Sequence, residues 1–413
     1  MTTKSEDSRE FDIIVQGASG FTGTLVAEYL LRTYGVGGDL RWAIAGRNEK
    51  KLQQVRDSLG DAASKLEIIV ADSFDDDALL SLASRTRVVL TTVGPYALYG
   101  SNLVAACVEA GTHYCDLAGE VQWIRKMIDL HHDRAQQTGA KIVHCCGFDS
   151  IPMDIGVLAL QDAVHEKYGA YCESISLLVK ATKGTASGGT LASMMNLIKE
   201  SREDRDVARV LIHPYSLNPE GERQGPDERD QQNVVYSDDL KSWTAPFVMA
   251  GVNTKIVRRS HALAGYPYGK DFRYDESVST GEGVSGWSKG MIMTLGLGSV
   301  VMLASFTPTR NFLERFVLSK PGEGPNRELQ QTGFFNLVQI GKLPDGTIVH
   351  GKVTGDQDPG YGSTSKMLSE SAVCLAKDKL EAGGGVLTPA SAMGRPLLKR
   401  LRKNAGLSFE LLD

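Results

Sequence analysis

The sequence predicts an α/β fold: a doubly wound parallel sheet, an inserted α+β domain and a C-terminal helical return. Three observations lead to this prediction. Short apolar runs alternate with amphipathic helical patterns over residues 11–145, which is typical of a parallel sheet covered on both faces. The alternation fades after about residue 155, and the length of 413 residues indicates more than one domain. We therefore expect a first domain at 1–154, an inserted domain at 155–355, and helices at 356–413 that pack back on the first domain.

The alternating region supplies the elements of the first sheet. Its apolar runs predict strands at residues 11–16, 40–45, 66–71, 88–93, 113–116 and 141–145. Apolar positions that recur at helical spacing predict the intervening helices, at residues 24–34, 49–59, 75–84, 103–110 and 121–138. Because the strands alternate with helices through short loops, they are expected to run parallel.

After residue 155 the pattern is mixed. Its expected elements are a strand at 174–182, a helix at 189–202, an extended polar loop at 213–245, and strand-like runs within 246–280 and 332–358. These runs indicate a mixed or antiparallel sheet. Two helices are then expected at 363–376 and 388–401, the second with Thr388 as its N-cap and Pro389 at its first position.

A glycine-rich turn, GASGFTG, stands directly after the first strand and directly before the first helix. In this context the first glycine makes a tight turn, and the second lets the backbone approach a pyrophosphate. The third lets helix and strand pack closely, with the helix N-terminus aimed at negative charge. The motif predicts a Rossmann-type dinucleotide-binding domain. The residues expected to contact the dinucleotide here are Gly17, Ser19, Gly20, Phe21, Thr22 and Gly23.

The end of the second strand indicates which dinucleotide is bound. An NAD-binding domain usually carries Asp or Glu here to bind the ribose 2′-hydroxyl. This chain instead has Arg47, and the next acidic residue is Glu49. A guanidinium pairs well with a 2′-phosphate, so we predict NADPH as the cofactor. The alternative is that Arg47 is a surface charge at the start of the next helix.

Two further strand ends are expected to complete the cofactor pocket, because ligands of open α/β sheets bind at the carboxyl ends of the strands. Asp72 follows the third strand and is expected to bind the adenine amino group. Its alternative role is to cap the helix that starts near Asp75. The fourth strand is followed by a loop whose backbone is expected to run beside the nicotinamide ribose, at Thr92, Val93, Gly94 and Pro95.

Candidate catalytic side chains follow the fifth and sixth strands. Both strand ends should open onto the cofactor cleft, and their titratable residues are Tyr114, Asp116, Glu120, Asp149 and Asp154. Each is a proton donor, a positioning residue or a capping residue. The sequence does not choose among these roles. Tyr114, Asp116 and Asp149 are the catalytic candidates.

Composition excludes several other classes of function. The net charge is −5, with no long block of Lys and Arg, which argues against nucleic acid as a partner. The 6 cysteines form no CxxC pair and no metal-ligand spacing with the 8 histidines. We therefore expect no metal, and reduced thiols in a cytoplasmic protein.

One segment, residues 290–306, carries no charge over its whole length. It is shorter than the roughly 20 residues that a membrane-spanning helix needs. Three alternatives stay open: a buried helix or one wall of a substrate tunnel, a peripheral contact with a membrane, and a true span. In the first case, Gly296 and Gly298 would let an acyl chain approach the helix backbone.

The motifs along the whole chain resemble those of the saccharopine dehydrogenase-like oxidoreductases, and within them the mycobacterial trans-acting enoyl reductases. The early motifs are shared by many saccharopine-like proteins, and the later ones are more specific to the enoyl reductase branch. The matching segments are FDIIVQGASGFTG at the start, AGR at 45–47, VVLTTVGPY at 88–96, YCDLAGE at 114–120, CGFDSIPMD at 146–154, NTKIVRRS at 253–260 and GVLTPASAMG at 385–394.

This resemblance implies an NADPH-dependent enoyl reductase that works in trans. It would reduce a carbon–carbon double bond of a polyketide or fatty acyl chain carried by a modular polyketide synthase, in the biosynthesis of cell-envelope lipids. Two rival functions stay open. A saccharopine-type amine or imine dehydrogenase would need cations that bind amino-acid carboxylates, such as Arg258 and Arg259 facing the cleft. A non-catalytic, lipid-associated protein would keep the nucleotide pocket only as a sensor.

Overall fold

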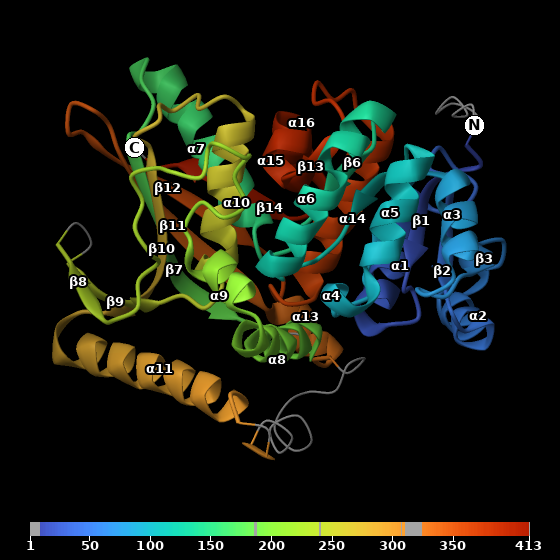
Figure 1. The fold of residues 1–413 in the computed structure, drawn as a ribbon, viewed down its shortest axis with the longest axis horizontal. Coiled ribbons are helices and arrows are strands. Elements are labelled where there is room, and N and C mark those ends of the chain that lie inside the picture. The colour runs from blue at the N-terminus through green and yellow to red at the C-terminus, as the bar shows by residue number, and fades with distance from the viewer. Residues whose placement is uncertain (1–8, 186–187, 239–240, 307, 310–323, 413) are drawn as a thin grey trace.

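The computed structural model of the chain describes residues 9–412, apart from 186–187, 239–240, 307 and 310–323. Two seven-stranded sheets form the centre of the molecule, one built mainly from the N-terminal third of the chain and one mainly from its middle (Figure 1). The chain returns from the second sheet to the first near its C-terminus. The predicted doubly wound sheet and the second, mixed sheet are both present.

The first sheet has the strand order β13-β6-β5-β4-β1-β2-β3, and all of its strands are parallel. The order reverses between β1 and β4, which is where such sheets bind ligands. Its strands are β1 (Phe11–Gln16), β2 (Trp42–Gly46), β3 (Glu67–Val70), β4 (Thr86–Thr91), β5 (His113–Cys115), β6 (Lys141–Val143) and β13 (Gly385–Leu387).

Helices cover both faces of this sheet. Side chains of β1 alternate between the two faces, so that Ile13 and Val15 join one core while Ile14 joins the other. The helices on the Ile13 face are α1 (Phe21–Tyr34), α2 (Glu49–Ser58) and α14 (Gly362–Lys377). Those on the other face are α3 (Asp76–Ser84), α5 (Ser101–Ala110) and α6 (Val121–Thr138).

The second sheet has the order β14-β12-β11-β7-β10-β9-β8. Only β7 and β10 pair in parallel within it, and the other described pairs are antiparallel. Its strands are β7 (Ser174–Lys183), β8 (Val235–Ser237), β9 (Ser242–Pro246), β10 (Arg273–Gly281), β11 (Phe334–Lys342), β12 (Ile348–Gly355) and β14 (Leu407–Leu411).

The sequence did not predict two long helices, one that joins the two sheets and one that joins β9 to β10 within the second sheet. The helix α7 (Ile151–Tyr168) runs across the expected domain boundary at residue 154 and packs on β12 and β14. The helix α10 (Ala250–Leu263) lies within 246–280, where strand-like runs were expected, so that prediction was wrong for these residues. Both helices are buried around most of their circumference. A helix of this kind shows no amphipathic stripe that could reveal its period.

The C-terminal return is less purely helical than predicted. The helix α14 packs against α1, and both Tyr29 and Tyr34 donate hydrogen bonds to the buried carboxylate of Glu370. Thr388 caps α15 (Pro389–Ala392), with Pro389 in its first turn, and α16 (Gly394–Asn404) follows. However, this segment also adds β13 to the first sheet and β14 to the second. These strands pair with distant partners, so their local sequence carries little signal.

The apolar run belongs to α11 (Gly283–Ala304), which lies along the edge of the molecule below α8 (Gly188–Glu203) (Figure 1). Its side chains are mostly exposed; Ile292 is 72% exposed and Leu295 is 62% exposed. Apart from the helix's own backbone and the adjoining residues, no described atom lies within 4 Å of a Cβ built on Gly296 or Gly298. The expectation of a buried helix or a tunnel wall is therefore wrong for the part of the chain that the structure describes.

The remaining helices are short and lie between the larger elements. They are α4 (Tyr96–Tyr99), α9 (Arg205–Ile212), α13 (Arg327–Thr332) and a 3-10 turn at Asp61–Ala63.

Candidate cofactor and substrate site

The glycine-rich loop joins β1 to α1 and depends on glycine at two positions. Gly17 has a φ of 87°, in the left-handed region that favours glycine. A Cβ on Gly23 would overlap the carbonyl oxygen of Gly17, so α1 can approach the loop this closely only with glycine there. Ser19 and Gly20 are exposed at the tip of the turn. The loop therefore presents open backbone to a ligand.

The N-terminus of α1 has the properties of a phosphate-binding site. Gly20 is its N-cap, and no described side chain accepts a hydrogen bond from the first-turn amides. Such unsatisfied amides, together with the helix dipole, favour a bound phosphate. The ring of Phe21 packs edge-on against Tyr361, with 4.9 Å between ring centroids. Phe21 therefore offers a ligand its backbone amide rather than its ring. The residues present fit a dinucleotide.

Arg47 is exposed at the carboxyl end of β2. It forms no hydrogen bond or ion pair with another described residue, so its guanidinium is available to a ligand. The neighbouring Gly46 lies close to the glycine loop, because a Cβ there would stand 3.8 Å from Ser19 Oγ. Asn48, not Arg47, caps α2 by accepting a hydrogen bond from the Lys51 amide at 3.0 Å. Arg47 thus precedes the helix and lies beside the predicted ribose site.

Asp72 lies at the carboxyl end of β3 and forms a local turn. Its Oδ1 accepts a hydrogen bond from the Phe74 amide at 3.0 Å, whereas Asp75 caps α3. The alternative role of Asp72 as helix cap is therefore not what the structure shows. Phe74 is 67% exposed and lies edge-on to Tyr99. Its ring offers an adenine base an apolar face. The sequence analysis did not predict this residue. The signal for it was an aromatic residue soon after the aspartate at the end of a strand.

The loop after β4 lies directly against the glycine-rich loop. The Thr92 amide donates to the Gln16 carbonyl at 3.1 Å, and Thr92 Oγ1 donates to the Gly17 carbonyl at 3.2 Å. Residues 92–95 therefore begin at the point where the strand order of the sheet reverses. The structure brings the predicted cofactor residues from the ends of four strands to one edge of the sheet.

Tyr114 and Asp116 belong to a buried polar cluster at the ends of β5 and β6. Tyr114 donates to Asp116 at 2.9 Å, and His144 Nδ1 lies 2.7 Å from the same carboxylate. Asp116 also accepts hydrogen bonds from the amides of Ala118 and Cys145. Both Tyr114 and Asp116 are 0% exposed. Side chains without exposed atoms cannot touch a substrate in this conformation, so the geometry favours a positioning role for both.

Glu120 also holds backbone in place. Its carboxylate accepts hydrogen bonds from the Tyr96 and Ala97 amides, at 2.7 and 2.9 Å, and from Ser193 Oγ at 2.9 Å. Burial raises the pKa of this carboxyl. Glu120 therefore satisfies the first amides of α4 and ties the loop after β4 to α8.

Asp149 is placed differently from the other candidates. It lies in the loop after β6, between Cys145 with a φ of 64° and Ser150 with a φ of 119°. Positive φ in residues other than glycine is strained and concentrates at functional sites. Asp149 is half-buried, accepts no hydrogen bond from a described residue, and has a pKa raised to about 6 by burial. Because β6 and β4 run parallel in the same sheet, the loop that carries Asp149 begins at the same edge of the sheet as the loop at 92–95.

Asp154 and Glu276 are buried carboxyls that connect elements. Asp154 accepts hydrogen bonds from Ser260 Oγ at 2.5 Å and from the Ala390 amide at 2.7 Å, and burial raises its pKa to about 7. Glu276, which sequence reasoning missed, accepts hydrogen bonds from Asn253 Nδ2 and Tyr274 Oη, both at 3.0 Å. Burial raises its pKa to about 8. Asn253 Oδ1 in turn accepts a hydrogen bond from the Ser150 hydroxyl, so Glu276 supports the loop that carries Asp149.

Arg258 and Arg259 do not form a carboxylate-binding pair. Arg258 is paired with Asp227 at 2.6 Å and is 5% exposed. Arg259 is 2% exposed and donates hydrogen bonds to the carbonyl oxygens of Leu217 and Val386. Both guanidinium groups are therefore used internally. Two cations facing the cleft would have supported an amino-acid dehydrogenase, and these two arginines do not supply them.

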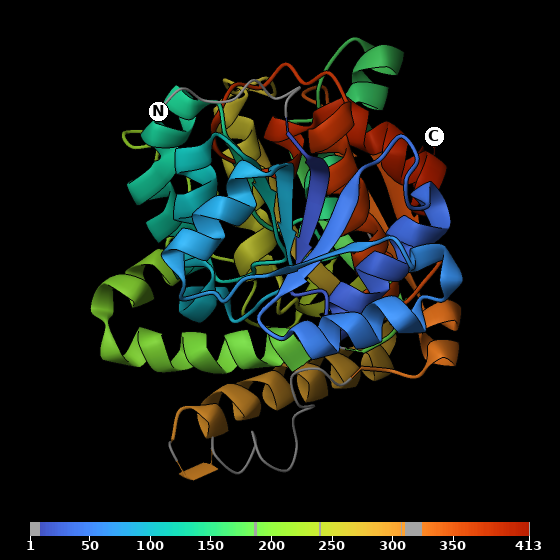
Figure 2. The same ribbon diagram turned by 90° about the vertical axis from the view of Figure 1, so that its right-hand side faces the viewer.

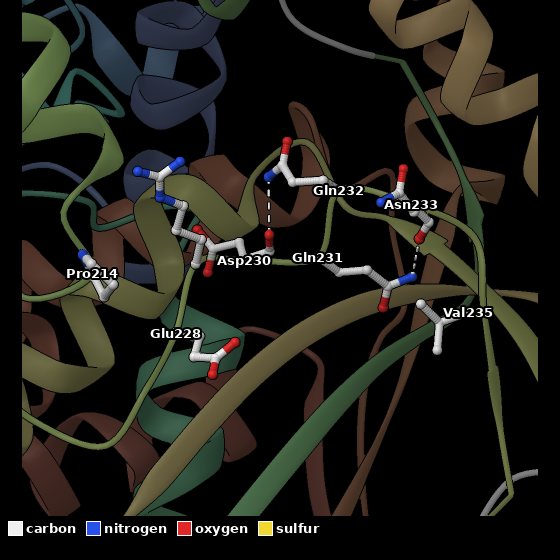
Figure 3. A pocket seen from close by; sticks show the side chains of 8 residues that line it. Pro214, Glu228, Asp230, Gln231, Gln232, Asn233 and Val235 are labelled. Carbon is white, nitrogen blue, oxygen red and sulfur yellow. Dashed lines mark hydrogen bonds between the residues drawn. The ribbon is translucent and has the colours of Figure 1, made fainter.

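A hollow of about 610 Å³ lies in the second half of the chain, and Figure 3 shows the side chains that line it. Its wall is the segment 228–235 together with Pro214. Gln231 Nε2 donates to the Asn233 carbonyl, and Gln232 Nε2 donates to the Asp230 carbonyl. Gln231 also exchanges hydrogen bonds with Thr244 on β9, and Asp230 accepts one from Thr254 on α10. None of the residues that line this hollow is among the predicted cofactor residues.

Comparison with known proteins agrees with this geometry. Residues 13–143 match the family described as the saccharopine dehydrogenase NADP-binding domain. A Mycobacterium tuberculosis protein provisionally named a trans-acting enoyl reductase is 42% identical over 97% of both chains. The trans-acting enoyl reductase of Mycobacterium bovis is 39% identical over 96% of this chain and 97% of its own.

One solved structure shows the same fold over the full length. Saccharopine dehydrogenase (L-Glu forming) from Saccharomyces cerevisiae aligns with a TM-score of 0.51 and 14% identity, and covers 98% of this chain and 100% of its own. At that identity the likeness concerns the fold alone. The NADP-binding domain and the full-length relatives together show that the chain belongs to the saccharopine dehydrogenase-like family of NADP-binding oxidoreductases, with the mycobacterial trans-acting enoyl reductases among its members.

Proposed function

We propose that the protein is an NADPH-dependent enoyl reductase acting in trans on the acyl chain of a polyketide or fatty acid synthase. The observation that carries this proposal is the full-length likeness to proteins named trans-acting enoyl reductases, at 39% identity over 96% of the chain. The open glycine-rich loop and the unpaired Arg47 support NADPH rather than NADH as the reductant. Cytoplasmic synthesis of cell-envelope lipids is the setting that we propose for it.

When bound, NADPH would supply a hydride to the β-carbon of an α,β-unsaturated thioester. The residues of this chain have three tasks around that transfer. The N-terminus of α1 would hold the pyrophosphate, and Arg47 the 2′-phosphate. The backbone at 92–95 would orient the nicotinamide ribose. The α-carbon then needs a proton.

Asp149 is the residue that we propose as the proton donor. Its raised pKa of about 6 keeps more of the carboxyl protonated near neutral pH than an ordinary aspartate would be. It is partly exposed, in the loop that follows β6, whereas Tyr114 and Asp116 are fully buried. The buried contact from Ser150 to Asn253 keeps the loop in its strained conformation. Asp149 is therefore the candidate that can reach a substrate.

The test is NADPH oxidation measured with the purified protein against matched enoyl, β-keto and cyclic imine substrates. The acyl substrates would be offered both as coenzyme A thioesters and on an acyl carrier protein. We expect turnover with the enoyl thioesters only. Turnover with the imines would favour a saccharopine-type amine dehydrogenase, and tight NADPH binding without any turnover would favour a nucleotide sensor.

A further inference from the structure

We propose that α11 docks on an anionic lipid surface, lying in the plane of the interface. The outermost stripe of the helix is apolar apart from Ser299. It consists of Ile292, Leu295 and Met302, which are 72%, 62% and 59% exposed, and Phe306, just beyond the end of the helix, is 57% exposed. The water-facing stripe of a surface helix normally carries charged residues. Exposed apolar surface on this scale marks an interaction site.

The flanks of the stripe are apolar as well. Met293, Val300, Val301 and Leu303 are between 38% and 44% exposed, so the apolar surface extends around the helix beyond a single row. A partner helix or groove covers one row of side chains. A helix that lies in a membrane interface buries its apolar face about 5–10 Å deep, so the interface covers the flanks of that face as well as its outermost row. This distribution is the reason for choosing a lipid surface over a second protein or a second copy.

Both ends of α11 are attached to the body of the protein, which determines its orientation. At its start, a Cβ on Gly286 would overlap the Gly281 carbonyl, and one on Gly290 would stand 3.0 Å from Val234 Cγ1. At its end, Ala304 is buried and the guanidinium of Arg202 on α8 lies 5.6 Å from the Phe306 ring centroid. A spanning helix must place its ends on opposite sides of a core about 30 Å thick. Since both ends contact one side of the same body, the helix can only lie along the surface (Figure 2).

Charged and aromatic side chains flank the apolar stripe in the positions that a lipid interface favours. Trp287 is 44% exposed near the start of the helix. Lys180 and Lys289 line a hollow of about 520 Å³ beside Met293. Arg202 and Phe306 stand together at the far end. Aromatic rings and long cationic side chains are enriched at the boundary between headgroups and acyl chains, and the cations complement anionic lipid headgroups. The ligand is therefore an anionic bilayer surface.

The test uses the full chain and vesicle flotation. The vesicles are made of phosphatidylcholine, with or without phosphatidylglycerol. We expect binding to the anionic vesicles, weakened at high salt because the cations contribute. Ile292→Asp and Met302→Asp should each lower the vesicle partition coefficient by about tenfold or more. Lys289→Glu should weaken binding to the anionic vesicles only.

Leu130→Asp is the matched control. Leu130 lies on α6, in the first domain, and is 59% exposed, as Met302 is. We expect this variant to bind vesicles like the wild type. All variants should keep the wild-type melting temperature, because the changed side chains are exposed.

The proposal is overturned if the wild type does not float with the anionic vesicles, or if Leu130→Asp loses binding as much as Met302→Asp. It is also overturned if light scattering shows a dimer that Ile292→Asp converts to a monomer, since a second copy would then cover the helix. These readouts do not depend on reductase activity.

Discussion

A methyl group on Gly17 would stand 2.6 Å from Val93 Cγ2. The first glycine of the cofactor motif and the loop after β4 are therefore in direct contact across the reversal of strand order. Two segments separated by about seventy-five residues form one wall of the predicted cofactor cleft, as the hydrogen bond from Thr92 Oγ1 to the Gly17 carbonyl also shows. Gly17 is therefore needed for packing against Val93, whereas Gly20 has no such contact and leaves space for a ligand.

Gly20→Val is expected to abolish NADPH binding without unfolding the protein. Gly20 has a φ of −83°, and a Cβ there would meet only the Gly17 carbonyl oxygen, at 3.3 Å. The side chain would instead fill the space in which the pyrophosphate meets the backbone. Gly17→Ala is the contrasting variant, and it should cost about 1–3 kcal/mol of stability because of its positive φ and the contact with Val93. Thermal melting and NADPH titration measure both. Native NADPH affinity in a well-folded Gly20→Val protein would place the cofactor elsewhere.

Arg47→Asp is expected to reverse the cofactor preference. The wild type should bind NADPH about 10- to 100-fold more tightly than NADH, the value of one charge-assisted contact. The aspartate would repel the 2′-phosphate and accept a hydrogen bond from the ribose 2′-hydroxyl of NADH. Lys65→Asp makes the same charge change in the segment that leads into β3 and should leave the preference unaltered. Equal affinity of the wild-type protein for both cofactors would show that Arg47 is only a surface charge.

Asp149→Asn is expected to lower kcat by about a hundredfold or more, with NADPH affinity unchanged. The wild-type kcat/KM should fall as the pH rises above about 6, because the acid must be protonated and burial raises its pKa to about 6. The variant should lose that part of the pH profile. Asp154→Asn should keep the profile, since Asp154 is buried and bonded to Ser260 and to the Ala390 amide. An unchanged pH profile in Asp149→Asn would exclude Asp149 as the acid.

Glu276→Gln is expected to alter how stability depends on pH. Burial raises the pKa of Glu276 from the ordinary value of 4.5 to about 8. The folded state then binds more protons than the unfolded state between these values, so the free energy of unfolding falls as the pH rises from 4.5 through about 8. Glutamine resembles the protonated carboxyl and does not titrate, so the variant should not lose stability in this pH range. At pH above 8, melting should occur roughly a few degrees higher in the variant than in the wild type. Parallel melting curves from acid to alkaline pH would contradict this assignment.

The first sheet could be predicted from the sequence nearly strand by strand. Each of its first six strands lies between helices with short loops, so local periodicity and the glycine-rich turn were sufficient signals. The same reasoning located the loops at 17–23 and 92–95, and Arg47 after β2. The helices α7 and α10 could not be found in this way, because they are buried on nearly all sides and carry Asp154, Asn253 and Lys255 inside.

The roles of the candidate catalytic residues could not be predicted from the local sequence pattern. Three aspartates have similar sequence contexts, because each lies just after a strand or in the first turn of a helix: Asp116, Asp149 and Asp154. Packing from distant segments makes them differ: Asp116 is bonded to His144, and Asp154 to Ser260 on α10. Asp149 alone among these three is left without a described hydrogen-bond partner and partly exposed.

The sequence by itself determined the parallel sheet, the open N-terminus of α1 and the place of Arg47 directly after β2, because each depends on neighbouring residues and on the direction of one strand. Only the tertiary structure decided burial. Burial depends on which remote segments pack on a residue, and no local pattern records it. For the same reason the sequence could describe residues 290–306 as apolar but not as exposed. It is the attachment of α11 at both of its ends that leaves Ile292, Leu295 and Met302 facing outward.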